Sequence, residues 1–153
     1  MSKDVGDLRS DVKVAAVEAL ADIKAAGIDI LVTSTSRSIH HQIALWAQGR
    51  CPLVVVNHLR MLASMLPIKE AENKYTVTNC DGVTTKSAHQ DDRAIDVVVV
   101  RHGKSLWNYK LYPREYKQIG DIFRLHGFTW GGDFKPIDPV SGLGFDPFHA
   151  EMA

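Results

Sequence analysis

Two short stretches of the sequence combine histidine with carboxylate side chains. Residues 85–96 read TKSAHQDDRAID and contain His89 and Asp96, and the chain ends in FDPFHAEMA, where Asp146 precedes His149 by three positions. Two neutral imidazoles and one carboxylate form a three-ligand zinc set that leaves a coordination position open for water. Such a site supports Lewis-acid chemistry, so the sequence raises the hypothesis of a catalytic metal centre.

Asp96 needs a positively charged partner. The run AIDVVVV, residues 94–100, predicts a strand buried on both faces, in which the carboxylate begins an apolar row. A buried charge is costly unless it is paired or bound to a metal. Arg93, Arg101 or a metal shared with His89 could each supply the positive charge. An ion pair with an arginine therefore stands beside the metal hypothesis.

A metal of this kind needs a base beside its bound water. Asp146 lies three residues before His149 across Pro147, so in a tight turn its carboxylate could lean over the metal without binding it. Glu151 shares the side of His149 in an extended segment. It is therefore the alternative base, or else a hydrogen-bond partner of a ligand.

The first half of the chain predicts mainly helices. Apolar residues recur at helical spacing from Asp4 to Ala26, and a short β-rich run, IDILVTS, follows from Ile28. Ser38 is placed to cap a second helix that ends near Gln48. Residues 51–67 combine an apolar run with a helix that Asn57 could cap and that ends before Pro67, and their assignment is open.

The second half contains most of the predicted strands. KYTVTNCDG, residues 74–82, alternates like a strand and is expected to pair with 94–100. A helix is predicted for 113–126, a strand for 128–130 and a loop for 131–144. The last residues alternate, with Phe148, Ala150 and Met152 on one side of an extended segment. The pattern predicts an α+β fold in which flanking helices cover a small antiparallel sheet.

Composition limits the possible partners. The 153 residues suit one domain, with the 18 basic and 18 acidic side chains in balance. This balance argues against nucleic acid as the main partner. No stretch approaches a membrane span and no export signal precedes the first helix, so we expect synthesis in the cytoplasm without membrane insertion. Cys51 and Cys80 lack metal-site spacing and are expected to be buried or idle thiols.

The motifs resemble a family of zinc peptidases. SAHQDDRAID is similar to the S-x-H-x-x-G-x-A-x-D signature of the D-Ala-D-Ala carboxypeptidase (VanY-like) and L-alanyl-D-glutamate endopeptidase group, and DPFHAE is similar to its D-x-x-H-x-E ending. TSTSRSIHHQIALWAQGR resembles the family's T-S-G-Y-R-S stretch and the helix after it. GFTWGGDF resembles the W-G-G-D-W segment of the phage endolysin branch. The resemblance implies a Hedgehog/DD-peptidase-like zinc peptidase fold over residues 1–153.

The resemblance also implies roles for individual residues. His89, Asp96 and His149 would bind one Zn²⁺ per chain, and Asp146 would be the general base. Arg37 would hold a substrate carboxylate or the developing oxyanion, and Ser87 would form a hydrogen bond near the metal. Trp130 and Asp133 would line the cleft or orient ligands without touching zinc.

Some positions depart from the family pattern. Asp92 stands where the signature has a glycine in a tight turn, and Asp tolerates unusual dihedral angles better than most residues. Ser36 and Ala150 replace aromatic residues, which implies a thinner aromatic lining of the cleft. The segment 51–74 has no counterpart, and the loop between Asp133 and Asp146 is longer than usual. These differences leave the substrate preference open.

Three functions fit these observations. The first is a phage endolysin that cuts the stem peptide of bacterial peptidoglycan between L-Ala and D-Glu, as a monomer that waits in the host cytoplasm until the membrane is permeabilised. The second is a D-Ala-D-Ala carboxypeptidase or dipeptidase with the same chemistry, and the third is a non-catalytic zinc module that binds peptidoglycan. The other histidines are expected at the surface or in the core: His40, His41, His58, His102 and His126. The tryptophans are expected in the core, although a wall-degrading enzyme could use one as a platform for a sugar: Trp46, Trp107 and Trp130.

Overall fold

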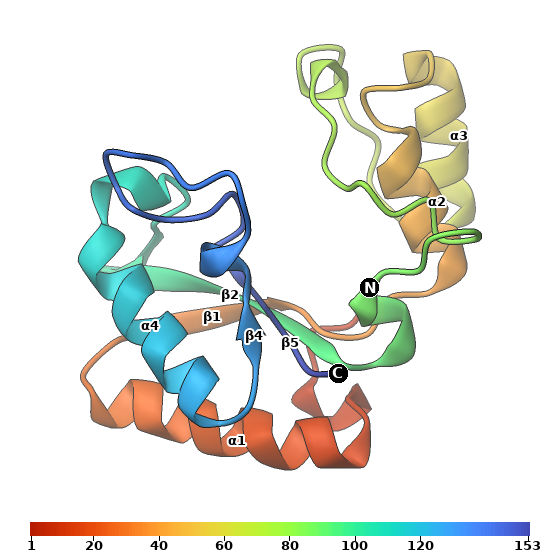
Figure 1. The fold of residues 1–153 in the computed structure, drawn as a ribbon. Helices are drawn as coiled ribbons and strands as arrows, with labels where there is room; N and C mark the ends of the chain where they lie inside the picture. The colour runs from red at the N-terminus through yellow and green to blue at the C-terminus, as the bar shows by residue number, and fades with distance from the viewer.

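The structure is a computed structural model that describes residues 1–153, and a five-stranded sheet lies at its centre (Figure 1). Four strands form one antiparallel path in the order β1 (Ile30–Ser34), β2 (Ala94–Arg101), β5 (His149–Glu151) and β4 (Thr129–Trp130). The fifth, β3 (Lys104–Ser105), pairs with the end of β2 through a turn at His102 and Gly103. The predicted α+β class is confirmed, although the β2–β3 hairpin was not anticipated.

The two long helices bury one face of the sheet. α1 (Ser10–Ala25) and α4 (Pro113–Leu125) contact each other and share one hydrophobic core with the sheet. The strand β2 contributes alternate residues to this core: Ile95, Val97 and Val99. Because successive side chains of a strand point to opposite faces, Asp96 lies on the face away from the core. One face of the sheet thus covers the hydrophobic core, and the opposite face carries Asp96.

Both long helices confirm the predictions with small changes. The helix expected for residues 4–26 is divided into a 3₁₀ turn, η1 (Val5–Asp7), and α1, and the chain leaves it through Gly27 at φ 77°. The helix expected for 113–126 is α4, with Pro113 in its first turn. Gly120 faces the indole of Trp130 so closely that a β-carbon would collide with the ring.

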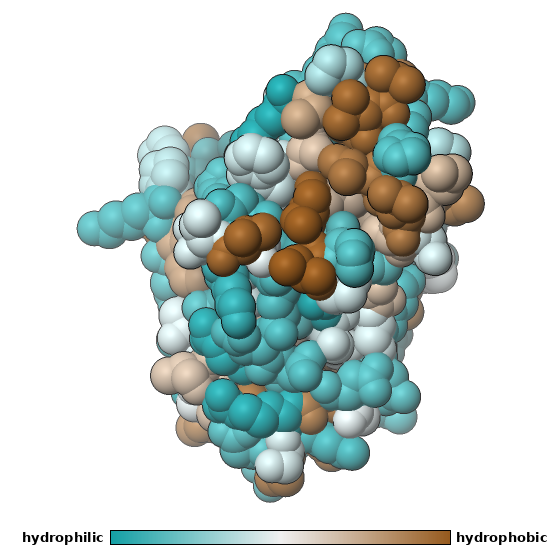
Figure 2. Space-filling model, turned by 90° about the vertical axis from the view of Figure 1, so that its right-hand side faces the viewer, coloured by the Kyte–Doolittle hydropathy of each residue, from teal (hydrophilic) through white to brown (hydrophobic).

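Residues 39–80 form a lobe that stands apart from the sheet and its two helices (Figure 1). Its helices are α2 (Ile39–Ala47), capped by the Ser38 side chain, and α3 (Leu53–Leu62). A separate small core holds them together: Ala47, Val56 and Ile68. Figure 2 shows hydrophobic side chains gathered on the upper part of the face that includes this lobe, and several apolar side chains of α3 are exposed: Val54, Val55, Met61 and Leu62.

The expected cap at Asn57 is wrong. The helix α3 begins five residues earlier, at Leu53 after Pro52, and Asn57 lies within it. Its side-chain amide donates to the carbonyl of Ile68 at 3.0 Å and accepts from the amide of the same residue at 2.8 Å. Asn57 therefore binds the backbone of Ile68 to α3 and does not cap a helix.

The strand predicted for residues 74–82 is also wrong. A 3₁₀ turn, η2 (Glu72–Lys74), leads into a segment without regular structure, and the places beside β2 are taken by β1 and β5. The alternation misleads because Tyr75 and Val77 are exposed, so no apolar face exists for a sheet to bury. The Asp-Gly signal does mark a turn, in which the Asp81 carboxylate accepts from three following amides.

The remaining predictions concern thiols, the last loop and membrane spans. Cys51 and Cys80 are free and partly buried. The loop after Trp130 contains a short 3₁₀ turn, η5 (Gly131–Asp133), and otherwise lacks regular structure up to β5. None of the helices combines the length and the hydropathy that crossing a membrane requires.

Candidate metal centre

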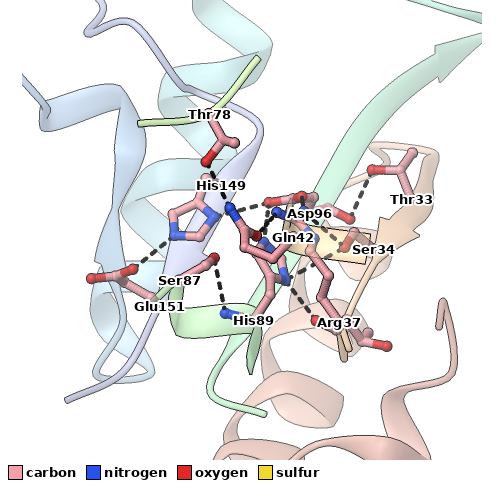
Figure 3. A network of polar contacts seen from close by, with 11 residues as sticks. Thr33, Ser34, Arg37, Gln42, Thr78, Ser87, His89, Asp96, His149 and Glu151 are labelled. Carbon is pink, nitrogen blue, oxygen red and sulfur yellow. Dashed lines mark hydrogen bonds and ion pairs between the residues drawn. The ribbon is translucent and has the colours of Figure 1, made fainter. Parts of the chain in front are cut away.

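His89, Asp96 and His149 converge on one point (Figure 3). His89 comes from a 3₁₀ turn, η3 (Ala88–Asp91), whereas Asp96 and His149 are paired residues of β2 and β5. One Asp96 oxygen, Oδ1, lies 3.1 Å from His89 Nε2 and 2.9 Å from His149 Nδ1. One ligand atom from each side chain lies within 4.8 Å of the others, so the group is able to hold a metal ion.

Local hydrogen bonds hold η3 in position. Ser87 caps the turn: its hydroxyl accepts from the amide of His89, and the Gln90 side chain accepts from the amide of Ser87. Asp92 then adopts a left-handed conformation at φ 54°. The tight turn expected at the glycine position of the signature is thus formed with Asp92. The contacts of Ser87 are made to the backbone that carries His89.

The hydrogen bonds of each imidazole identify the nitrogen that faces the centre. His89 Nδ1 lies 2.6 Å from the carbonyl oxygen of Thr35, which only accepts, so Nδ1 carries the proton and Nε2 points inward. His149 Nε2 lies 2.9 Å from a carboxylate oxygen of Glu151, and Nδ1 points inward. Such partners fix ring orientation in metal sites. Glu151 therefore contacts the outer side of a histidine, where it orients the ring.

Charge at the centre favours a bound cation. Three carboxylates, Asp96, Asp146 and Glu151, surround the two histidines, and Arg37 is the cation nearest to Asp96, at 3.8 Å. Burial opposes the charged form of His149, but its bonds to Asp96 and Glu151 prevail and raise the pKa of His149 to about 10. Burial likewise opposes ionisation of Asp96, but the two histidines hold the pKa of Asp96 well below its usual range. Without a metal ion, a proton on His149 thus provides the positive charge beside Asp96. A bound metal ion would provide that charge instead.

Asp146 lies beside this group in the same cleft. Burial raises the pKa of Asp146 to about 6, and the neighbouring Asp96 carboxylate adds to the rise. Two contacts position the chain here: Trp130 Nε1 donates to the carbonyl of Pro147 at 2.9 Å, and Gly131 packs on the Asp146 carbonyl with no room for a side chain. A carboxylate with a pKa near neutrality suits proton transfer.

Arg37 is largely buried between β1 and the cleft. Its Nη1 donates to Gln42 Oε1 at 2.9 Å, its Nη2 lies 3.4 Å from the hydroxyl of Ser34, and its Nε has no hydrogen-bond partner. Gln42 is fully buried and also donates to Thr78 Oγ1 and to the carbonyl of Cys80 (Figure 3). The guanidinium therefore keeps free donor capacity and is joined through Gln42 to the lobe.

The group lies in a cleft of about 710 Å³, within the usual range for small-ligand sites. The lobe contributes residues 76–80 to its lining, and four aromatic side chains contribute from elsewhere: Trp107, Phe134, Phe145 and Phe148. The aromatic lining expected to be thin is thus supplied by other segments.

Several expectations require correction. Asp133 faces outward and pairs with Arg124 at 2.7 Å, so it neither lines the cleft nor orients a ligand. Trp130 is a core residue that holds the turn before His149. Trp107 is 56% exposed at the cleft, and the expectation of a core position is wrong.

The contributions of two residues to the cleft were missed by sequence reasoning: Trp107 lines it, and Gln42 supports its wall. Gln42 follows the Ser38 cap on α2, and nothing in the local pattern shows that its amide meets Arg37 and the lobe. The half-exposed position of Trp107 depends on the unanticipated β2–β3 hairpin. A signal that could have found Trp107 is its place beside that short turn, RHGK. The other histidines lie outside the cleft, for example His126, which contacts Asp22 of α1.

Known proteins resemble this chain in sequence over one segment and in fold over almost its whole length. The sequence model of a peptidase family described as D-alanyl-D-alanine carboxypeptidase matches residues 81–140, which is less than half the chain. No curated protein sequence matches the chain significantly. Similar solved structures are the LdcB LD-carboxypeptidase (16% identity, 95% of this chain, TM-score 0.57) and the L-Ala D-Glu endopeptidase ChiX of Serratia marcescens (16%, 97%, 0.54). The Zn(II) complex of the vancomycin resistance D,D-pentapeptidase VanY is also similar (15%, 95%, 0.57).

These likenesses show the fold. The chain has the α+β zinc peptidase fold of VanY and its structural relatives. It spans 58% of the LdcB chain, 83% of the ChiX chain and 72% of the VanY chain. The donor set fits zinc, because two imidazole nitrogens and one carboxylate oxygen are ordinary zinc ligands and three protein ligands are typical of catalytic sites.

Proposed function

We propose that the protein is a zinc-dependent peptidase that cleaves the stem peptide of bacterial peptidoglycan. The observation that carries the proposal is the convergence of His89, Asp96 and His149 beside a buried Asp146 in an open cleft. The fold shared with the LdcB LD-carboxypeptidase, which recognises peptidoglycan, and with the L-Ala D-Glu endopeptidase ChiX supports the same substrate class. His89 Nε2, an Asp96 oxygen and His149 Nδ1 would hold the ion.

The residues of the chain divide the work of amide hydrolysis. A zinc ion bound there supplies Lewis acidity. Asp146 accepts a proton from the attacking water and passes it to the leaving nitrogen as the C–N bond breaks and the new C–O bond forms. Arg37, whose side chain lines the cleft, would donate hydrogen bonds to a substrate carboxylate or to the developing oxyanion. Glu151 keeps His149 oriented.

The bond between L-Ala and D-Glu is the proposed scissile bond, and lysis of a phage-infected host is the proposed role. The motif resemblance to endolysins and the fold shared with ChiX support this choice. The proposal includes a monomer made in the host cytoplasm that reaches the wall after the membrane is permeabilised. None of these finer points is needed for the chemistry at the centre.

A second candidate is a carboxypeptidase that removes a terminal residue of the stem peptide. Both the family description for residues 81–140 and the folds of LdcB and VanY favour it. A non-catalytic zinc module is the third candidate. A buried carboxylate with a raised pKa at Asp146 disfavours that module, because binding alone has no use for a proton acceptor.

Digestion of purified sacculi by the zinc-loaded protein separates these candidates. Released fragments are identified by mass, and newly exposed amino groups are labelled. If the protein is the endopeptidase, new amino termini are expected on D-Glu. Release of free D-Ala would show instead that the protein is the carboxypeptidase. Binding of sacculi with no cleaved product would leave only the module.

A further inference from the structure

The side chains that line the cleft differ in chemical type between the two ends of β2. Asp96 lies near the start of this strand, and the chain before it carries Lys86 and Arg93 at the cleft surface. Beyond the other end of β2, the β3 hairpin delivers Trp107 to the same cleft. Because a strand rises about 3.3 Å per residue, the two ends of β2 are separated by more than the length of one amino acid. The metal-binding group thus lies between a basic end and an aromatic end.

The aromatic end consists of two pairs of packed aromatic rings that line the same cleft. Trp107 packs on Phe148 with ring centroids 5.5 Å apart, and Phe134 packs on Phe145 at 5.7 Å. Phe134 also lies 6.1 Å from the ring of His149, so this surface begins at the metal-binding group. Trp107 is 56% and Phe145 53% exposed. Large aromatic side chains left half-exposed in a cleft are typical of a surface that a ligand covers.

The basic end has a different chemistry. Lys86 is exposed and lies 3.9 Å from Asp91, and Arg93 lies 3.8 Å from the same carboxylate while donating to the carbonyl of Met152. Asp91 is shared between Lys86 and Arg93, so its single charge balances only one of these two cations. Stem peptides carry small side chains and several carboxylates, and these groups gain little from an aromatic surface.

We infer that the aromatic end, with Trp107 at its centre, is a binding subsite for the N-acetylated sugar that carries the stem peptide. This inference rests on the proposed function. The C–H face and the acetamido methyl of such a sugar are apolar and match an exposed indole. The L-Ala to D-Glu bond is one amino acid from the sugar, so a substrate cut at the centre places its sugar beside Phe134 and Trp107. The acidic remainder extends toward Lys86 and Arg93.

Binding measured without turnover tests the subsite. Calorimetry on the zinc-free protein compares a disaccharide-linked muropeptide with the same peptide carrying only an N-lactoyl group. The parent is expected to prefer the disaccharide ligand, and Trp107→Ala to weaken its binding by about tenfold, or about 1.4 kcal/mol, with little change for the lactoyl peptide. Phe145→Ala is expected to act in the same direction. Tyr75→Ala removes an even more exposed aromatic ring outside the cleft and serves as the matched control.

The outcomes are distinct. Equal affinity of the parent for both ligands, no binding of either ligand, or equal losses for both ligands in Trp107→Ala would overturn the subsite. Zinc-loaded parent is tested on the same two ligands for cleavage. Sugar-dependent binding without cleavage would refute the proposed activity and retain the subsite, whereas cleavage of both ligands with equal KM and equal affinity would retain the activity and remove the subsite. Circular dichroism of each variant shows whether it has folded.

Discussion

The two walls of the cleft are held in different ways. Asp96 and His149 lie on paired strands, so backbone hydrogen bonds between β2 and β5 fix their separation. Residues 76–80 of the lobe have no regular structure, and side-chain bonds from Gln42 hold them in place. The sheet wall is therefore suited to precise chemistry, and the lobe wall to selecting what enters. Changes in the sheet wall should affect metal binding or turnover, and changes in the lobe wall should affect substrate affinity.

The largest expected effect comes from removing a ligand on the sheet side. His89→Ala leaves two of the three donors, so zinc content is expected to fall from about one per chain to near zero, with loss of activity. Elemental analysis and sacculus digestion measure both. His58→Ala removes an exposed histidine of the lobe and should leave zinc unchanged. Zinc content in His89→Ala equal to that of the parent would contradict the ligand assignment.

Asp146→Asn should separate turnover from metal binding. The amide has nearly the shape of the carboxylate but accepts no proton, so kcat is expected to fall about 10² to 10⁴-fold while zinc is retained. In the parent, activity should decline as the pH falls through about 6 or below, because Asp146 then becomes protonated. Rates on muropeptide at several pH values test this. Near-normal turnover by the variant would transfer the role of base to Glu151.

Glu151→Gln tests the hydrogen bond between Glu151 and the proposed ligand His149. The variant weakens the bond that orients His149, and changes of this kind typically reduce metal affinity about 10 to 100-fold. With saturating zinc, kcat should remain close to that of the parent. Competition with a chelator measures the affinity. A loss of kcat that excess zinc does not restore would mean that Glu151 takes part in the chemistry itself.

Zinc binding should be coupled to proton release. In the metal-free protein His149 has a pKa of about 10, so zinc must displace its proton, and apparent affinity should fall about tenfold per pH unit below that value. The raised pKa also stabilises the metal-free fold below the unfolded value of 6.5, and this contribution is lost as the pH rises through about 10. Calorimetry in buffers of different ionisation enthalpy counts the protons. Release of none would refute the coupling.

Much of the sheet wall could be predicted from the sequence, because its signals are local. The apolar run 94–100 predicts the strand that carries Asp96, and the alternation around His149 predicts the extended segment that carries this histidine. The lobe wall could not be predicted. Tyr75 and Val77 alternate like strand residues yet are exposed, so tertiary pairing overrides the local pattern. Contacts of Gln42 with residues 36 and 38 positions away have no local signature.

Gln42→Leu is the mildest test and the one aimed at the lobe wall. The substitution leaves Arg37 Nη1 and the carbonyl of Cys80 without the partner that Gln42 provides, which is expected to lower the free energy of unfolding by about 1 to 3 kcal/mol. KM should rise, because Arg37 and residues 76–80 lose their common support, while kcat and zinc content change little. Denaturant titration and steady-state kinetics measure these effects.

Gln48→Leu is the matched control for this variant. Gln48 is also buried in the lobe, but its amide donates to the carbonyl of Glu72 away from the cleft. It should therefore lose stability with an unchanged KM. Equal rises of KM in both variants would mean that the lobe acts only through its overall stability. A fall in kcat as large as that expected for Asp146→Asn would mean that the lobe wall belongs to the chemistry, and the division between the two walls would not hold.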